Sequence, residues 1–129
     1  MDTYDPDIAP DPESWLEMDE AERMVLVLDY HEEAGDDVPK LRIHAAIHLI
    51  VENQLAMNYG SVAATLARLI AQDDLGRHEA VHAIGAVLAE LLFDRMRGAG
   101  KVDFDGADYE EGLRTLTAGT WRERYGTPE

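Results

Sequence analysis

Residues 77–97 have the sequence RHEAVHAIGAVLAELLFDRMR, the strongest structural signal in the chain. Apolar side chains recur in it every three or four residues, a spacing that aligns them on one side of an α-helix. A helix with so wide an apolar stripe must pack against other helices, because the stripe would otherwise face water. Gly98 and Gly100 predict where this helix ends. The stripe consists of Val81, Ile84, Leu88, Leu91, Leu92 and Met96.

Helical patterns also occur on both sides of this stretch. Asp19 and Glu22 have the spacing of a capping box and predict the start of the first helix. Ser61 is expected to cap the third helix. Short connections favour antiparallel neighbours, so we expect an all-α fold, a bundle of four to five helices. The expected helices cover residues 20–33, 40–57, 61–72, 77–97 and 109–118.

The domain organisation follows from length and composition. With 129 residues, the chain has the size of one domain, which we place at residues 13–129. Residues 1–12 contain three prolines and four aspartates and are expected to form a flexible acidic lead-in. The chain has no cysteine, which excludes disulfides and thiolate ligands and fits a cytoplasmic location.

The formal net charge is −16, and it is concentrated near the start of the chain. Residues 1–37 hold 14 acidic side chains and a single basic one, Arg23. A nucleic-acid binder needs clustered Lys and Arg, so we expect no nucleic-acid partner. The same deficit disfavours anionic membranes, and no apolar stretch is long enough to span a bilayer. The acidic segment fits a solvated surface or a surface for a basic protein partner, whose identity the sequence does not give.

Four of the five histidines form two pairs with the same spacing: His44 with His48, and His78 with His82. Residues four apart lie on the same face of a helix, with Cβ atoms about 5–6 Å apart. Two such imidazoles can bind one cation, with nitrogen–metal bonds of about 2.0–2.1 Å. The fifth, His31, falls at a helix end, where we expect it to be exposed.

Carboxylates extend both pairs. Glu52 follows His48 by four residues, and Glu79 precedes His82 by three, the Glu-x-x-His spacing found in di-iron helical bundles. If the helices over 40–57 and 77–97 pack side by side, these side chains converge on one site. The sequence therefore predicts a zinc or iron site. Its predicted ligands are His44, His48, His78, His82, Glu52 and Glu79.

Two alternatives remain open at this point. Residues 78–82 also match the H-E-x-x-H motif of zinc peptidases, in which Glu79 would be the catalytic general base of a metal-dependent hydrolase. A peptidase needs a third ligand, for which the downstream candidates are Glu90, Glu110 and Glu111. Alternatively, the histidines form a hydrogen-bonded polar core without metal, in a non-catalytic interaction module with an acidic surface.

Residues 41–97 resemble a family of short bacterial proteins catalogued as a domain of unknown function. The two histidine motifs carry the resemblance, together with Glu52-Asn53-Gln54-Leu55 and Leu66-Ala67-Arg68-Leu69 between them. The resemblance implies a helical fold and a bacterial, cytoplasmic source, and it implies no particular activity.

Small residues leave room for a close helix contact beside the second histidine pair. Gly85 and Ala89 share a helical face with His82, so another helix can approach closely there. That helix belongs either to the same chain or to a second copy in a homodimer.

Overall fold

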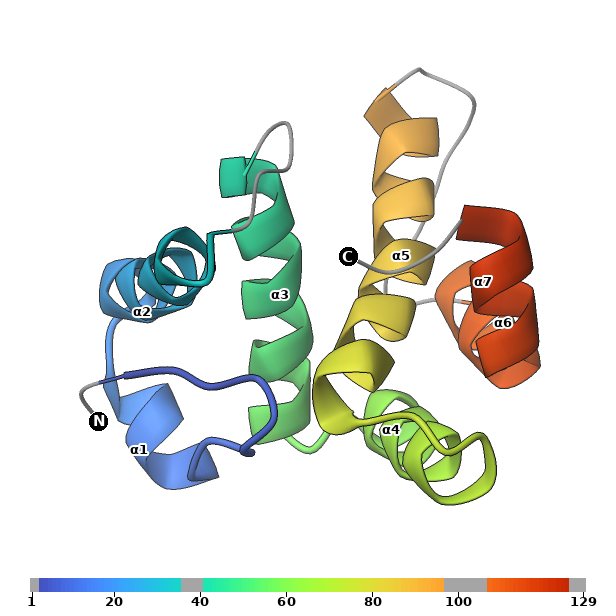
Figure 1. Ribbon diagram of the computed structural model, residues 1–129, viewed down its shortest axis with the longest axis horizontal. Helices are drawn as coiled ribbons and strands as arrows, with labels where there is room; N and C mark the ends of the chain where they lie inside the picture. Colours follow the sequence, from blue (N-terminus) through green and yellow to red (C-terminus); the bar gives the residue numbers. More distant parts are fainter. Residues whose placement is uncertain (1–2, 36–40, 97–106, 126–129) are drawn as a thin grey trace.

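The computed structural model describes residues 3–35, 41–96 and 107–125. Within these ranges the chain is all-α and forms a single domain of seven helices without a strand (Figure 1). The helices are α1 (Pro12–Glu17), α2 (Glu20–Glu33), α3 (Leu41–Ala56), α4 (Gly60–Gln72), α5 (Arg77–Met96), α6 (Ala107–Thr115) and α7 (Ala118–Tyr125).

Helices α3 and α5 form the centre of the molecule and run in opposite directions (Figure 1). Helices α1 and α2 pack on α3, whereas α4, α6 and α7 pack on α5. Each side has its own apolar core. Ala45 and Leu49 of α3 belong to the core on the α2 side, and Val51 belongs to the core on the α5 side. Helix α3 is therefore shared by both halves of the fold.

The four long predicted helices and the helix after residue 106 are present, and the predicted capping box is confirmed. The Glu22 backbone N–H donates to Asp19 at 2.9 Å, and the Asp19 N–H donates to the Glu22 carboxylate at 3.2 Å. The cap predicted at Ser61 is wrong. Helix α4 begins one residue earlier, and its N-cap is Tyr59, which makes no side-chain capping bond. The predicted helix end near Gly98 lies outside the described residues.

Two short helices, α1 and α7, increase the number beyond the predicted four to five. Helix α1 has six residues, too few for a periodic pattern, and begins at Pro12 after the capping side chain of Asp11. Helix α7 follows closely on α6, and its Trp121 is buried in the core on the α5 side. No helix in the described part of the chain has the length and apolarity to cross a membrane.

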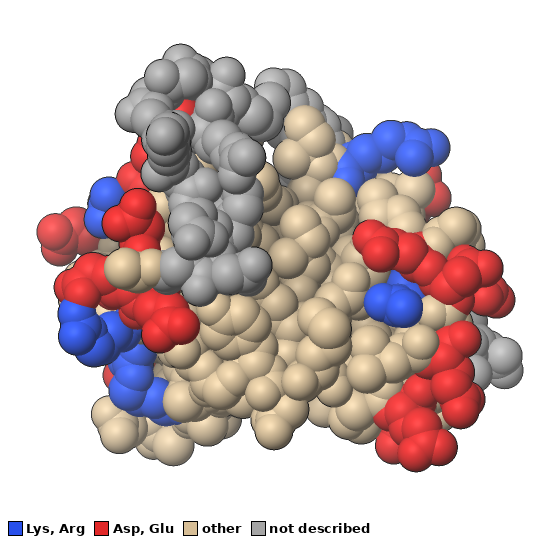
Figure 2. Space-filling model, turned by 180° about the vertical axis from the view of Figure 1, so that it is seen from behind, with Lys and Arg blue, Asp and Glu red and all other residues tan. Residues whose placement is uncertain are grey.

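Charged side chains are unevenly distributed over the surface. Figure 2 shows Asp and Glu gathered toward opposite edges of one face, while uncharged residues cover its middle. On this face the acidic side chains therefore lie at the flanks, away from the uncharged middle.

Helices α3 and α5 approach closely at Gly85. A Cβ atom added there would lie 2.9 Å from Cγ2 of Ile47, which is closer than normal side-chain contacts. The helix that packs closely against the small residues of α5 is thus α3 of the same chain. The homodimer stays a prediction.

We expect Gly85→Ala to destabilise the protein by about 1–3 kcal/mol, because the new methyl group would force α3 and α5 apart. Urea unfolding of the metal-free protein measures this change. Gly60→Ala is the matched control, since a Cβ at Gly60 meets no atom within 4 Å. A Gly85→Ala variant as stable as Gly60→Ala would contradict the close packing of these helices.

Candidate metal centre

The five histidines meet where α2, α3 and α5 come together. His31 comes from α2, His44 and His48 from α3, and His78 and His82 from α5. The ring centroids of His48 and His82 lie 4.6 Å apart, those of His31 and His48 4.6 Å apart, and those of His78 and His82 4.5 Å apart. The two pairs recognised in the sequence therefore face each other and enclose a common space.

Four of these side chains are arranged to bind one ion. His31, His48, His78 and His82 each offer a nitrogen atom, and these four atoms lie within 4.8 Å of one another. Tetrahedral ligands at about 2.0–2.1 Å from an ion are roughly 3.4 Å apart, so a small adjustment would bring all four into contact with it. In the described part of the chain, no other group of metal-ligating side chains is as close.

His48 is the imidazole that contacts all four others, and it is 2% exposed. Neither of its ring nitrogens has a hydrogen-bond partner among the described residues. A buried polar atom without a partner costs about 1–3 kcal/mol, and most such atoms in proteins are paired. A metal ion at the centre of the cluster would supply the missing partner.

His31 is fully buried, so the expected exposure at the end of its helix is wrong. Helix α2 packs on α3 and turns His31 inward, on the same side as the buried Val27 one turn earlier. Nδ1 of His31 lies 2.8 Å from the Val27 carbonyl oxygen. A carbonyl can only accept, so Nδ1 carries the proton, and in the neutral ring Nε2 holds the lone pair that a metal requires.

His44 lies beside the four-nitrogen group and is not part of it. Its ring centroid is 4.8 Å from that of His31 and 4.9 Å from those of His48 and His82. His44 therefore covers the cluster on the side where α3 begins. Its role as a ligand stays a prediction.

The cluster favours uncharged imidazoles. Burial lowers the pKa of His48 well below its usual value, and the neighbouring histidines, His82 first among them, lower it further. Burial, together with His78, His44 and His31, lowers the pKa of His82 to about 3. Both rings are thus deprotonated at neutral pH, the state in which imidazole binds metals.

The two predicted carboxylate ligands have other partners. Glu52 is 1% exposed and accepts a 2.5 Å hydrogen bond from the Tyr4 hydroxyl. Its two oxygens also accept bonds of 2.9 and 2.8 Å from the Arg77 guanidinium. Glu79 accepts a 3.1 Å bond from the backbone N–H of Gly76, at the start of α5. Metal ligation by these two carboxylates stays a prediction.

Sequence reasoning missed Tyr4 and Arg77 as neighbours of the site. Tyr4 is 48 residues from Glu52, and Arg77 is 25 residues from it. A helical spacing rule relates residues within a few turns and gives no signal for such pairs. His31 was detectable, because it shares a helical side with Val27.

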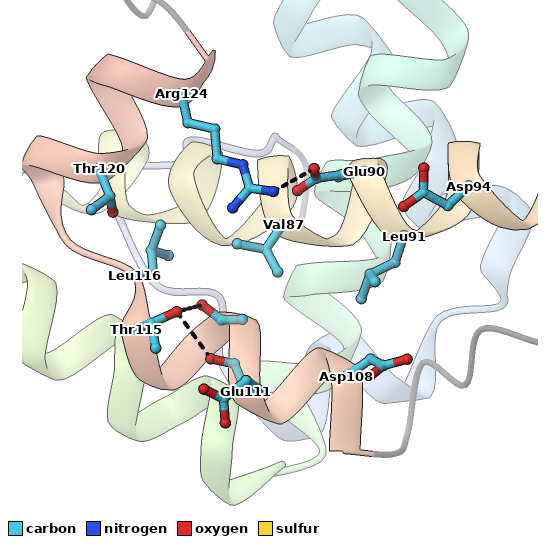
Figure 3. A pocket seen from close by; sticks show the side chains of 11 residues that line it. Val87, Glu90, Leu91, Asp94, Asp108, Glu111, Thr115, Leu116, Thr120 and Arg124 are labelled. Carbon is cyan, nitrogen blue, oxygen red and sulfur yellow. Dashed lines mark hydrogen bonds and ion pairs between the residues drawn. The ribbon is translucent and has the colours of Figure 1, made fainter. Parts of the chain in front are cut away.

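Several acidic residues line a cleft of about 510 Å³ between α5, α6 and α7 (Figure 3). Glu90, one of the candidate third ligands of a peptidase site, forms an ion pair there with Arg124 at 2.8 Å. Glu111, another candidate, pairs with Arg114. The lining contains no histidine, so the cleft is separate from the imidazole cluster.

The metal-free protein should lose stability as the pH falls below about 6.5. An unfolded histidine takes up a proton near pH 6.5, whereas folded His82 does so only near pH 3. The unfolded state then binds more protons, so each such imidazole removes up to about 1.4 kcal/mol per pH unit.

Urea unfolding between about pH 7 and pH 5 measures this slope, a range chosen to stay above most carboxylate titrations. His82→Leu serves as the comparison, because it lacks one of the two imidazoles and should show a shallower slope. A stability that does not change over this range would contradict neutral, buried imidazoles.

Comparison with known proteins places the chain in a family. The model of a domain of unknown function, DUF1841, matches residues 7–115, so the chain belongs to this family. The match confirms the resemblance noted for residues 41–97 and extends it in both directions. No curated protein and no solved structure matches the chain.

Proposed function

We propose that this DUF1841 protein binds one divalent transition-metal ion through His31, His48, His78 and His82. The four side chains come from three helices, and each offers a nitrogen to the same space. The proposed set differs from the sequence-based set, because it includes His31 and leaves out His44 and the two carboxylates, Glu52 and Glu79.

The observation that carries the proposal is the environment of His48. Its ring is buried, neither nitrogen has a hydrogen-bond partner among the described residues, and the other four imidazoles lie around it. A merely structural histidine would be expected to hydrogen-bond to a backbone or side-chain group. Metal coordination gives one of its nitrogens a strong partner and accounts for the gathering of rings around it.

The donor set is compatible with zinc or iron, the metals expected from the sequence. Neutral imidazoles suit zinc, iron, nickel and copper(II), and a chain without cysteine offers no thiolate for softer ions. A bound ion of this kind supplies Lewis acidity. It would also tie α2, α3 and α5 together, so binding should stabilise the fold by mass action.

The contacts of Glu79 do not favour the hydrolase alternative. A general base must reach the water or substrate that it deprotonates, and the Glu79 carboxylate instead accepts the backbone N–H of Gly76. The alternative of a metal-free polar core in an interaction module accounts for His78 and His82, whose Nε2 atoms lie 3.1 Å apart, within hydrogen-bond distance. It leaves both ring nitrogens of His48 without a partner among the described residues. Metal binding therefore has the most direct support.

Untagged protein loaded with Zn²⁺, or with Fe²⁺ without oxygen, should contain about one equivalent of metal by elemental analysis. Excess metal at about 100 times its dissociation constant should raise the free energy of unfolding by about 2.7 kcal/mol. His48→Leu and His31→Leu should abolish both effects, since each removes a proposed ligand.

His44→Leu is the matched control for these variants. It removes an imidazole that touches the same rings and lies outside the four-nitrogen group, so it should retain nearly full metal content. Wild-type protein that takes up no metal would refute the proposal. Loss of metal in His44→Leu but not in His31→Leu would refute the proposed ligand set.

A further inference from the structure

Three segments of the chain are joined at the first turn of α5. The N-terminal segment passes over this turn, and the second half of α3 lies beside it. The joining residues, which we call the N-terminal clamp, are Tyr4, Pro6, Asp7, Glu52 and Arg77.

The clamp is centred on a buried ion pair. Arg77 donates to both oxygens of Glu52, and their side chains are 11% and 1% exposed. Tyr4, which is 3% exposed, donates its hydroxyl to the same carboxylate. Burial raises the pKa of Tyr4 well above its usual value, and the negative charge of Glu52 raises it further, so the phenol remains a donor. A bidentate pair with a third hydrogen bond fixes the relative position of its members.

The N-terminal segment also binds the backbone of α5. Pro6 accepts a 2.8 Å hydrogen bond from Arg77 through its carbonyl oxygen, and the Asp7 carboxylate accepts a 3.2 Å bond from the backbone N–H of His78. The first N–H groups of a helix have no partner within the helix, and a negative charge beside them is favourable. Asp7 therefore holds in place the turn that carries His78.

The position of the clamp relates it to the histidines. Glu52 follows His48 by one helical turn in α3, and Arg77 directly precedes His78 in α5. The ion pair thus joins α3 to α5 one helical turn from His48 and directly beside His78, which lies in the first turn of α5. Since the charges of Glu52 and Arg77 neutralise each other, we expect the clamp to affect the site by fixing the positions of α3 and α5 and not by its charge.

We propose that the N-terminal clamp positions His78 and His82 against His48, and that it sets the affinity and geometry of the metal site. The residues of the clamp are positioning residues and do not ligate the ion. This inference rests on the proposed function, and it gives Glu52 a role different from the ligand role predicted from the sequence. Groups that orient metal ligands commonly contribute 10–100-fold to affinity.

The test is a Co²⁺ titration of the full-length protein, followed by visible absorption, which reports both affinity and coordination geometry. Glu52→Gln should weaken Co²⁺ binding by about 10–100-fold and change the absorption spectrum. Tyr4→Phe and Asp7→Asn, which keep the ion pair, should weaken binding by a smaller factor. Val62→Ala is the control for lost stability alone, because Val62 does not belong to the clamp and is fully buried in the core on the α5 side.

The outcomes separate this inference from the proposed function. If wild-type protein binds Co²⁺ and Glu52→Gln binds it as tightly as Val62→Ala, within about twofold, the clamp is refuted and metal binding stands. If Glu52→Gln does not fold, wild-type affinity and spectrum in both Tyr4→Phe and Asp7→Asn refute the clamp. If wild-type protein binds no Co²⁺, both proposals fail.

Discussion

The burial of uncharged imidazoles between α2, α3 and α5 is the constraint on which the rest of the structure depends. His31 and His48 are almost completely buried, and the pKa values of His48 and His82 are lowered by burial and by their neighbours. Packing such groups costs free energy unless each finds a partner. The same arrangement that is costly without an ion creates a nitrogen-lined space suited to one.

The geometry of this space depends on two contacts between α3 and α5 whose residues lie close to the histidines in sequence. Gly85 lets α5 approach Ile47 of α3, which brings the two histidine pairs within reach of each other. The buried pair of Glu52 and Arg77 then joins the same helices one turn away. A close helix contact and a fixed ion pair together limit how far His48 and His82 can move apart. Rigid placement of ligands is what a selective metal site requires.

Much of this arrangement could be predicted from local sequence. The 3.6-residue period in 77–97 located α5, and the equal spacing of the two histidine pairs placed each on one helical side. The short helices α1 and α7 gave too little periodicity to be recognised. The burial of His31 and the partners of Glu52 depend on how α2 and the N-terminal segment pack, and such contacts between distant residues have no local signature. Glu52 and Glu79 are predicted as ligands from their spacing to the histidines. Spacing does not show that their carboxylates already accept hydrogen bonds from other groups.

X-ray absorption at the metal edge tests the central claim most directly, because it counts the atoms bound to the ion. For zinc-loaded protein the account predicts a first shell of about four nitrogen atoms at roughly 2.0–2.1 Å, with the outer-shell scattering of imidazole rings. A first shell made mainly of oxygen atoms, with fewer than two imidazoles, would contradict it.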